Sequence, residues 1–180
     1  KVPYGTWIIR EIESPKGYVL SEEEIAVTIG KVDEVVEIEL VNYFIKGNIA
    51  LTKVDEDYPD NKLSGAVFEV YSDINGDGKL DKDDTLLGEM KELDGGVYQM
   101  SELRYGKYLV KETKAPTGFV LDENVYSVSV EENGKTYTVE NKAGVGFINA
   151  AQKGSLKIVK TSSDGKVEGF SFRVTGVDYD

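Results

Sequence analysis

The sequence predicts an all-β protein folded as an antiparallel β-sandwich, and three observations lead to this prediction. Apolar and polar residues alternate with a period of two in short segments such as 49–53 and 66–70. Asn133-Gly134 joins two further alternating runs within 125–140, which is typical of a β-hairpin turn. No segment sustains the 3.6-residue period of an amphipathic helix, so helices should be short or missing.

Composition excludes several classes of function. The chain has 180 residues, with 33 acidic against 21 basic residues and a formal net charge of −12. Such an acidic protein repels phosphate backbones and anionic lipid heads, so we expect no nucleic-acid partner. Because Cys and His are absent, thiolate and imidazole catalysis and the usual zinc sites are excluded. No apolar run reaches the ~20 residues of a membrane span, so we expect no membrane insertion in this segment.

The chain repeats itself. Residues 4–20, YGTWIIREIESPKGYVL, correspond to residues 105–121, YGKYLVKETKAPTGFVL, at a displacement of 101 positions. Residues 42–53, NYFIKGNIALTK, correspond to residues 149–160, NAAQKGSLKIVK, at a displacement of 107. An internal period of this kind indicates an array of similar units.

The repeat divides the chain into one complete unit and two incomplete ones. We expect residues 46–152 to form a complete domain, residues 1–45 to be the C-terminal part of a preceding domain, and residues 153–180 to be the N-terminal part of a following one. Because the first residue is Lys rather than Met, we also expect the chain to be a segment of a longer protein whose neighbouring repeats are its partners.

Polar residues occupy inward positions on three otherwise apolar strand faces of the complete unit: Lys53, Glu112 and Asn149. The flanking segments repeat the pattern at Glu11, Asn42 and Lys160. An unpaired buried charge costs several kcal/mol. These groups should therefore meet one another or lie at exposed strand ends.

Their meeting would permit one specific reaction. Burial drives a lysine towards its neutral amine and a glutamate towards its neutral acid. The Lys53 amine could then attack the Asn149 carboxamide while Glu112 transfers protons to the departing ammonia, which leaves a Lys53–Asn149 isopeptide bond. The alternative is a partly exposed salt bridge between Lys53 and Glu112, with Asn149 capping a turn.

The same residues carry a resemblance to a known family. Lys53 in IALTKVD, Glu112 in YLVKETKAPTGF and Asn149 in FINAAQKG resemble the reactive triad of the collagen-adhesin B-type (CnaB, prealbumin-like) domain. That family occurs in Gram-positive surface adhesins and pilins. The resemblance implies an immunoglobulin-like, prealbumin-like β-sandwich, a spontaneous isopeptide bond and an extracellular location at the cell surface or cell wall. The chain lacks a visible cell-wall sorting motif and pilin linkage motif.

Residues 73–84, DINGDGKLDKDD, match the consensus of a calcium-binding EF-hand loop. The candidate Ca²⁺ ligands are Asp73, Asn75, Asp77, Lys79 through its carbonyl, Asp81 and Asp84. Position 12 of the consensus is Asp84 rather than Glu, which shortens its reach. We expect a structural calcium loop inserted in a β-domain, with an ordinary solvated acidic turn as the alternative.

These observations predict a structural stalk or spacer repeat of an adhesin or pilus-like protein. The only reactive group of residues would be consumed by its own reaction, so we expect no enzyme that turns over other molecules. One alternative is a module that binds a host protein or glycan. A further possibility is end-to-end covalent assembly of neighbouring molecules through Lys160 and Asn42, assisted by Glu11.

Overall fold

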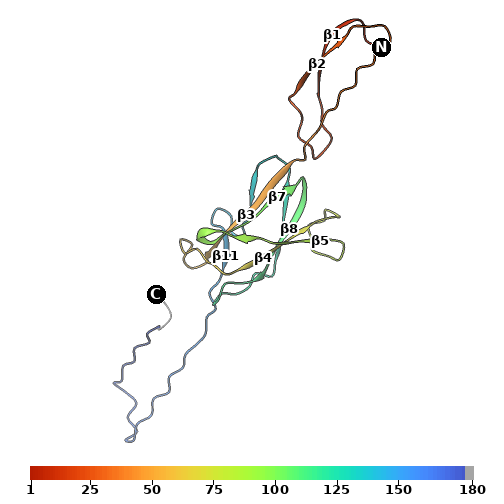
Figure 1. Cartoon of the computed structure of the whole chain (residues 1–180). Coiled ribbons are helices and arrows are strands. Elements are labelled where there is room, and N and C mark those ends of the chain that lie inside the picture. The colour runs from red at the N-terminus through yellow and green to blue at the C-terminus, as the bar shows by residue number, and fades with distance from the viewer. Residues whose placement is uncertain (177–180) are drawn as a thin grey trace.

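The computed structural model describes residues 1–176 and confirms the all-β prediction (Figure 1). Its elements, in chain order, are β1 (Gly5–Arg10), β2 (Glu24–Ile29), β3 (Lys46–Asp55), β4 (Val67–Ser72), β5 (Thr85–Glu89), β6 (Lys91–Glu92), the 3-10 turn η1 (Asp94–Gly96), β7 (Val97–Arg104), β8 (Gly106–Lys114), β9 (Val125–Val130), β10 (Thr136–Thr138) and β11 (Phe147–Asn149).

Two sheets form the sandwich of the central unit. One has the strand order β10-β3-β7-β6, with β11 also paired to β3, and the other has the order β5-β4-β8-β9. All their pairings are antiparallel except those of β3 with β10 and with β11, which are parallel. The first and last strands of the unit therefore run side by side in one direction.

The core lies between the two sheets. Phe68 of β4 packs edge-on against Tyr98 of β7 and Phe147 of β11, with ring centroids 5.1 Å and 4.9 Å apart. Ile49 and Val110, from opposite sheets, are fully buried in the same cluster. Each aromatic pair of this geometry contributes about 0.5–1.5 kcal/mol beyond its burial. The inward alternation read from the sequence thus describes the core of the central unit.

The predicted hairpin at 125–140 is wrong. The turn at Asn133-Gly134 exists, and Gly134 has the positive φ of 77° that such a turn requires. However, β9 pairs with β8 in one sheet, whereas β10 pairs with β3 in the other. The turn therefore carries the chain between sheets. Pairing with β10 satisfies backbone groups at the edge of β3, which a hairpin between β9 and β10 would have left unpaired.

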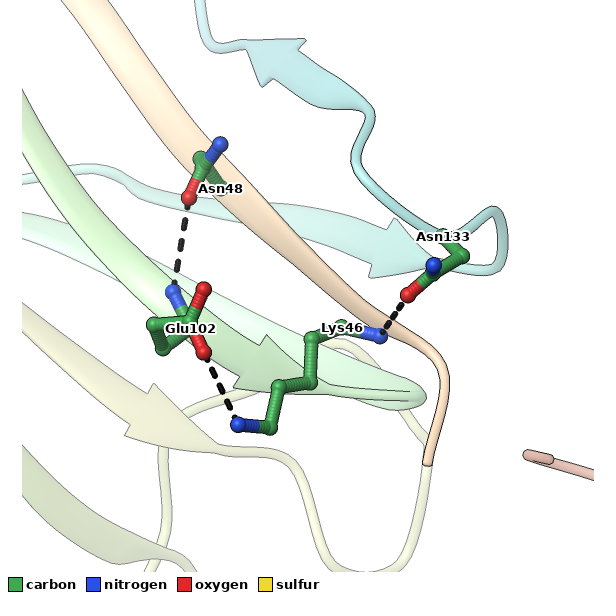
Figure 2. Close-up of polar contacts among 4 residues, drawn as sticks. All are labelled: Lys46, Asn48, Glu102 and Asn133. Carbon is green, nitrogen blue, oxygen red and sulfur yellow. Dashed lines mark hydrogen bonds and ion pairs between the residues drawn. The ribbon is translucent and has the colours of Figure 1, made fainter. Parts of the chain in front are cut away.

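Hydrogen bonds fix the start of β3 in place (Figure 2). The Lys46 backbone N–H donates to Asn133 Oδ1 at 3.0 Å, and Gly134 N–H donates to the Lys46 carbonyl at 2.7 Å. Lys46 Nζ forms an ion pair with Glu102 at 2.8 Å, and the Glu102 N–H donates to Asn48 Oδ1 at 3.4 Å. These contacts tie the strand that enters the sandwich to both of its neighbours.

The two flanking segments lie beyond opposite ends of the sandwich (Figure 1). The hairpin of β1 and β2 precedes β3. Residues 1–45 repeat the backbone contacts that end the central unit: Tyr18 bridges Phe44 as Phe119 bridges Ala151. Within the described part of the C-terminal segment, residues 153–176, there is no strand. The first strand of a following unit, equivalent to β3, is therefore not formed.

Candidate functional site

The structure brings Lys53, Glu112 and Asn149 together in the interior of the central unit. Lys53 lies on β3, Glu112 on β8 and Asn149 on β11. Lys53 and Glu112 are 0% exposed and Asn149 is 3% exposed. Strand β11 lies parallel to β3 with Phe147 opposite Lys53, so Asn149 sits two residues further along and its side chain is on the same inward face.

Each of the three side chains makes a specific contact. Asn149 Nδ2 donates to both Glu112 carboxylate oxygens, at 3.0 and 2.9 Å. Lys53 Nζ donates to the Phe147 carbonyl at 3.0 Å and lies 5.4 Å from the centroid of the Phe147 ring. The Asp122 backbone N–H donates to Glu112 Oε2 at 2.8 Å. Glu112 thus binds the carboxamide of Asn149. Lys53 is bound by the backbone of β11, the strand that carries Asn149.

The surroundings favour the neutral forms of the amine and the acid. Burial lowers the pKa of Lys53 to about 8, against the attraction of the Glu112, Asp122 and Asp55 carboxylates. The neutral amine, which is the nucleophilic form, is therefore more populated near neutral pH than it is for an exposed lysine. Burial likewise raises the pKa of Glu112, against hydrogen bonds from Asp122 N–H and Asn149 and the charge of Lys53.

One buried atom is left without a partner. Asn149 Oδ1 is inaccessible to solvent and accepts no hydrogen bond. A buried carbonyl without a donor costs about 1–3 kcal/mol, and native interiors contain few such atoms. A protonated Glu112 could donate to this oxygen after rotation of the carboxamide, so the unpaired atom is a natural acceptor for a proton that reaches Glu112.

A hydrogen-bonded group that could not be predicted from the repeat surrounds this site. Asp122 Oδ2 accepts hydrogen bonds from Tyr126 Oη at 2.7 Å and from Asn141 Nδ2 at 2.8 Å. Asn141 also bonds Ile148, accepting from its N–H at 2.6 Å and donating to its carbonyl at 2.9 Å. Asp122 directly follows the repeated motif at 105–121, but the copy in the first unit has Ser21 there, so the repeat gave no signal.

The N-terminal unit reproduces two of the three members of the site. Asn42 Nδ2 donates to the two oxygens of Glu11 at 2.7 and 2.8 Å, and Ser21 N–H donates to Glu11 Oε2 at 2.7 Å. Lys160 lies apart from this pair. Its Nζ donates to the Thr161 carbonyl at 2.5 Å and lies 4.3 Å from the centroid of the Phe170 ring.

The acidic loop at 73–84 is closed by hydrogen bonds to its own backbone. Asp73 is buried and accepts from Gly76 N–H at 2.7 Å and Gly78 N–H at 3.1 Å. Asp84 accepts from Ile74 N–H at 3.1 Å and Asp81 N–H at 2.9 Å, which joins the two ends of the loop.

The remaining candidate ligands are placed by similar turns. Asn75 Oδ1 accepts from Asp77 N–H and Asp77 Oδ1 accepts from Lys79 N–H, both at 2.9 Å. The donors are all oxygens, as Ca²⁺ prefers. No three acidic side chains within residues 1–176 are close enough to hold a metal ion as they stand, so Ca²⁺ binding would require the loop carboxylates to move closer together.

Comparison with known proteins assigns this sandwich to a class of β-domain. The model of the SpaA prealbumin-like fold domain matches residues 1–43 and 47–143, and the chain belongs to this family. No curated protein sequence matches the chain. Residues 1–176 contain no helix that is both long and apolar enough to cross a membrane.

Two solved structures illustrate the similarity. The Bacillus anthracis TIE protein is 29% identical with a TM-score of 0.67, and the match covers 83% of this chain and 26% of that one. BcpA, the major pilin subunit of Bacillus cereus, is 26% identical with a TM-score of 0.46, covering 74% of this chain and 35% of that one. The chain therefore spans about a quarter to a third of these relatives.

Proposed function

We propose that this chain is a load-bearing stalk segment of a Gram-positive cell-surface adhesin or pilus-like protein, closed by an isopeptide bond between Lys53 and Asn149. The observation that carries the proposal is the buried contact of Asn149 with Glu112, next to a buried Lys53. The prealbumin-like family and the resemblance of the triad to collagen-adhesin B-type domains support the extracellular setting.

The reaction needs no second molecule. A proton passes from Lys53 Nζ to Glu112, and the neutral amine attacks Cγ of Asn149. A bond forms between Nζ and Cγ, and the bond from Cγ to Nδ2 breaks. Glu112 gives its proton to Nδ2 and takes the second Nζ proton, so that an amine and a carboxamide give one amide and one ammonia and Glu112 ends protonated. Rigid placement supplies the high effective concentration, and each molecule reacts once.

The position of the bond suits a segment that carries tension. Its two residues lie on β3 and β11, the parallel strands that enter and leave the central unit, and the flanking segments lie at opposite ends of the sandwich (Figure 1). Force would pass through residues 46–53, the bond and the end of β11, and would bypass residues 54–148. These observations favour the load-bearing role over the ligand-binding role that the sequence left open.

The mass of the denatured protein tests the bond. We expect wild-type protein to be lighter than the mass calculated from its sequence by one ammonia. Lys53→Ala and Asn149→Ala should each have the full calculated mass for their sequence, and Glu112→Ala should remain largely unreacted because no group transfers the protons. Wild-type protein that retains the full calculated mass would contradict the proposal.

We also propose that the loop at 73–84 binds a structural Ca²⁺. The oxygen ligands would be Asp73, Asn75, Asp77, Asp81 and Asp84, with the Lys79 carbonyl. The support is the closure of the loop, in which Asp84 returns to the backbone of Ile74 next to Asp73. A bound cation would neutralise part of the acidic cluster and fix the connection between β4 and β5.

We further propose that copies of this chain join end to end through Lys160 and Asn42. Glu11 and Asn42 are already paired as Glu112 and Asn149 are, and the segment at 153–160 resembles the strand that carries Lys53. At high protein concentration we expect a ladder of covalent multimers on a denaturing gel. Lys160→Ala should abolish the ladder, and a single monomer band in the wild type would contradict this assembly.

A further inference from the structure

Asp122 and Asn141 connect the acid of the isopeptide site to the strand that carries its carboxamide. One end of this connection is the Asp122 backbone N–H, which donates to Glu112 Oε2 at 2.8 Å. The other end is Asn141, which bonds both backbone groups of Ile148, the residue before Asn149. The middle is the 2.8 Å hydrogen bond from Asn141 Nδ2 to Asp122 Oδ2. We call these two residues the Asp122–Asn141 bracket.

We propose that the Asp122–Asn141 bracket positions Asn149 and Glu112 for isopeptide formation. This inference rests on the proposed function, since it concerns the same bond. Neither side chain forms a hydrogen bond with Lys53, Glu112 or Asn149, and only the Asp122 backbone N–H reaches Glu112, so we class both side chains as positioning groups. Their effect is on the geometry in which Lys53 meets the carboxamide.

The bracket compensates for the shortness of β11, which has only three residues. On one side β11 pairs with β3, and the Asn149 carbonyl accepts from Glu56 N–H at 3.1 Å. On the other side the Asn141 side chain takes the place of a neighbouring strand, because its amide bonds the N–H and the carbonyl of Ile148 at once. Contacts on both edges restrict rotation of β11 about its axis, which sets the direction of the Asn149 side chain.

A hydrogen bond from a neutral amide to a carboxylate holds the middle of the bracket together. Burial opposes ionisation of Asp122, but hydrogen bonds from Asn141, Tyr126 and Asn124 outweigh it and lower the pKa of Asp122. The carboxylate therefore stays ionised and accepts from the Asn141 amide. In the N-terminal unit Ser21 occupies the equivalent position and keeps only the backbone contact to Glu11, so the carboxylate is an addition particular to the central unit.

The test measures the rate of ammonia loss in newly made protein. The full chain is synthesised in a cell-free system, samples are stopped in denaturant at intervals, and the reacted fraction is read from the intact mass. Asn141→Asp removes the donor and sets two carboxylates against each other. We expect it to slow the reaction by about tenfold to a hundredfold, the cost typical of a small misplacement of reacting groups.

A reversed pair distinguishes positioning from general damage. In the double variant Asp122→Asn with Asn141→Asp, the new carboxamide can donate to the new carboxylate, which still accepts from Ile148 N–H. We expect the double variant to recover most of the rate lost by Asn141→Asp alone. Asn61→Asp makes the same chemical change at an exposed position and should leave the rate unchanged.

As a control for folding, the same changes are made in a Lys53→Ala background, where no bond can form. Rates are compared at a temperature at which melting curves show all of these variants to be folded. If Asn141→Asp reacts at the wild-type rate, or if the double variant is no faster than Asn141→Asp, the proposed positioning role of the bracket is wrong. The proposal of an isopeptide bond is then unaffected. If the wild type itself loses no ammonia, both proposals fall together.

Discussion

Loss of the proposed Lys53–Asn149 bond is expected to cost the central unit about 5 kcal/mol of stability, by analogy with a disulfide that closes a loop of about 100 residues. For a domain of this size, 1 kcal/mol corresponds to about 4–8 °C in melting temperature. Lys53→Met and Asn149→Ala should therefore each lower the melting temperature by about 20 °C or more. Because both variants remove the same bond, their effects should not add in the double variant.

The same variants should differ most from the wild type when the protein is stretched. When the molecule is pulled from its two ends, the proposed bond should keep residues 54–148 of the wild type out of the force path. In Lys53→Met those residues unfold and add about 300 Å of extension, at roughly 3.3–3.6 Å per residue. Single-molecule stretching measures this length directly. An equal extension in the wild type and the variant would show that the unit carries load without a covalent bond.

Binding of Ca²⁺ is expected to give the second large change in melting temperature. A ligand at about 100 times its dissociation constant stabilises the folded state by about 2.7 kcal/mol, which corresponds to about 10–20 °C for a domain of this size. Melting curves with Ca²⁺ and with a chelator should differ by this amount. The comparison is made in the Lys53→Met background, where the melting transition is not obscured by the cross-link.

A matched pair of variants locates the calcium effect in the loop. Asp77→Asn keeps the acceptor for the Lys79 N–H but removes one negative charge, so it should weaken the response to Ca²⁺. Asp60→Asn removes the same charge at an exposed position outside the loop and should respond as the parent does. A melting temperature that does not depend on Ca²⁺ in the parent would identify the loop as a solvated acidic turn.

The inward positions of the central unit could be read from the sequence because strand alternation is local. A period of two fixes which side chains share a face, and it placed Lys53, Glu112 and Asn149 among apolar residues. The repeat strengthened this interpretation, and the Glu11–Asn42 contact has the same form as the Glu112–Asn149 contact. The hairpin predicted at Asn133-Gly134 was wrong because strand pairing is not a local property. A turn signal describes four residues, whereas the sheet that each flanking strand joins depends on which strand edge is free.

The sequence by itself determined the β-class of this protein, its repeated units and the three residues that face inward. Alternation depends only on residues close along the chain, and repetition is found by comparing one part of the sequence with another. Only the tertiary structure decided that β11 lies parallel to β3, that the Asn149 amide meets Glu112, and that Asn141 holds the free edge of β11. These contacts join residues that are distant in the chain or lie in its loops. Packing of two sheets selects them, and no periodic pattern encodes that choice.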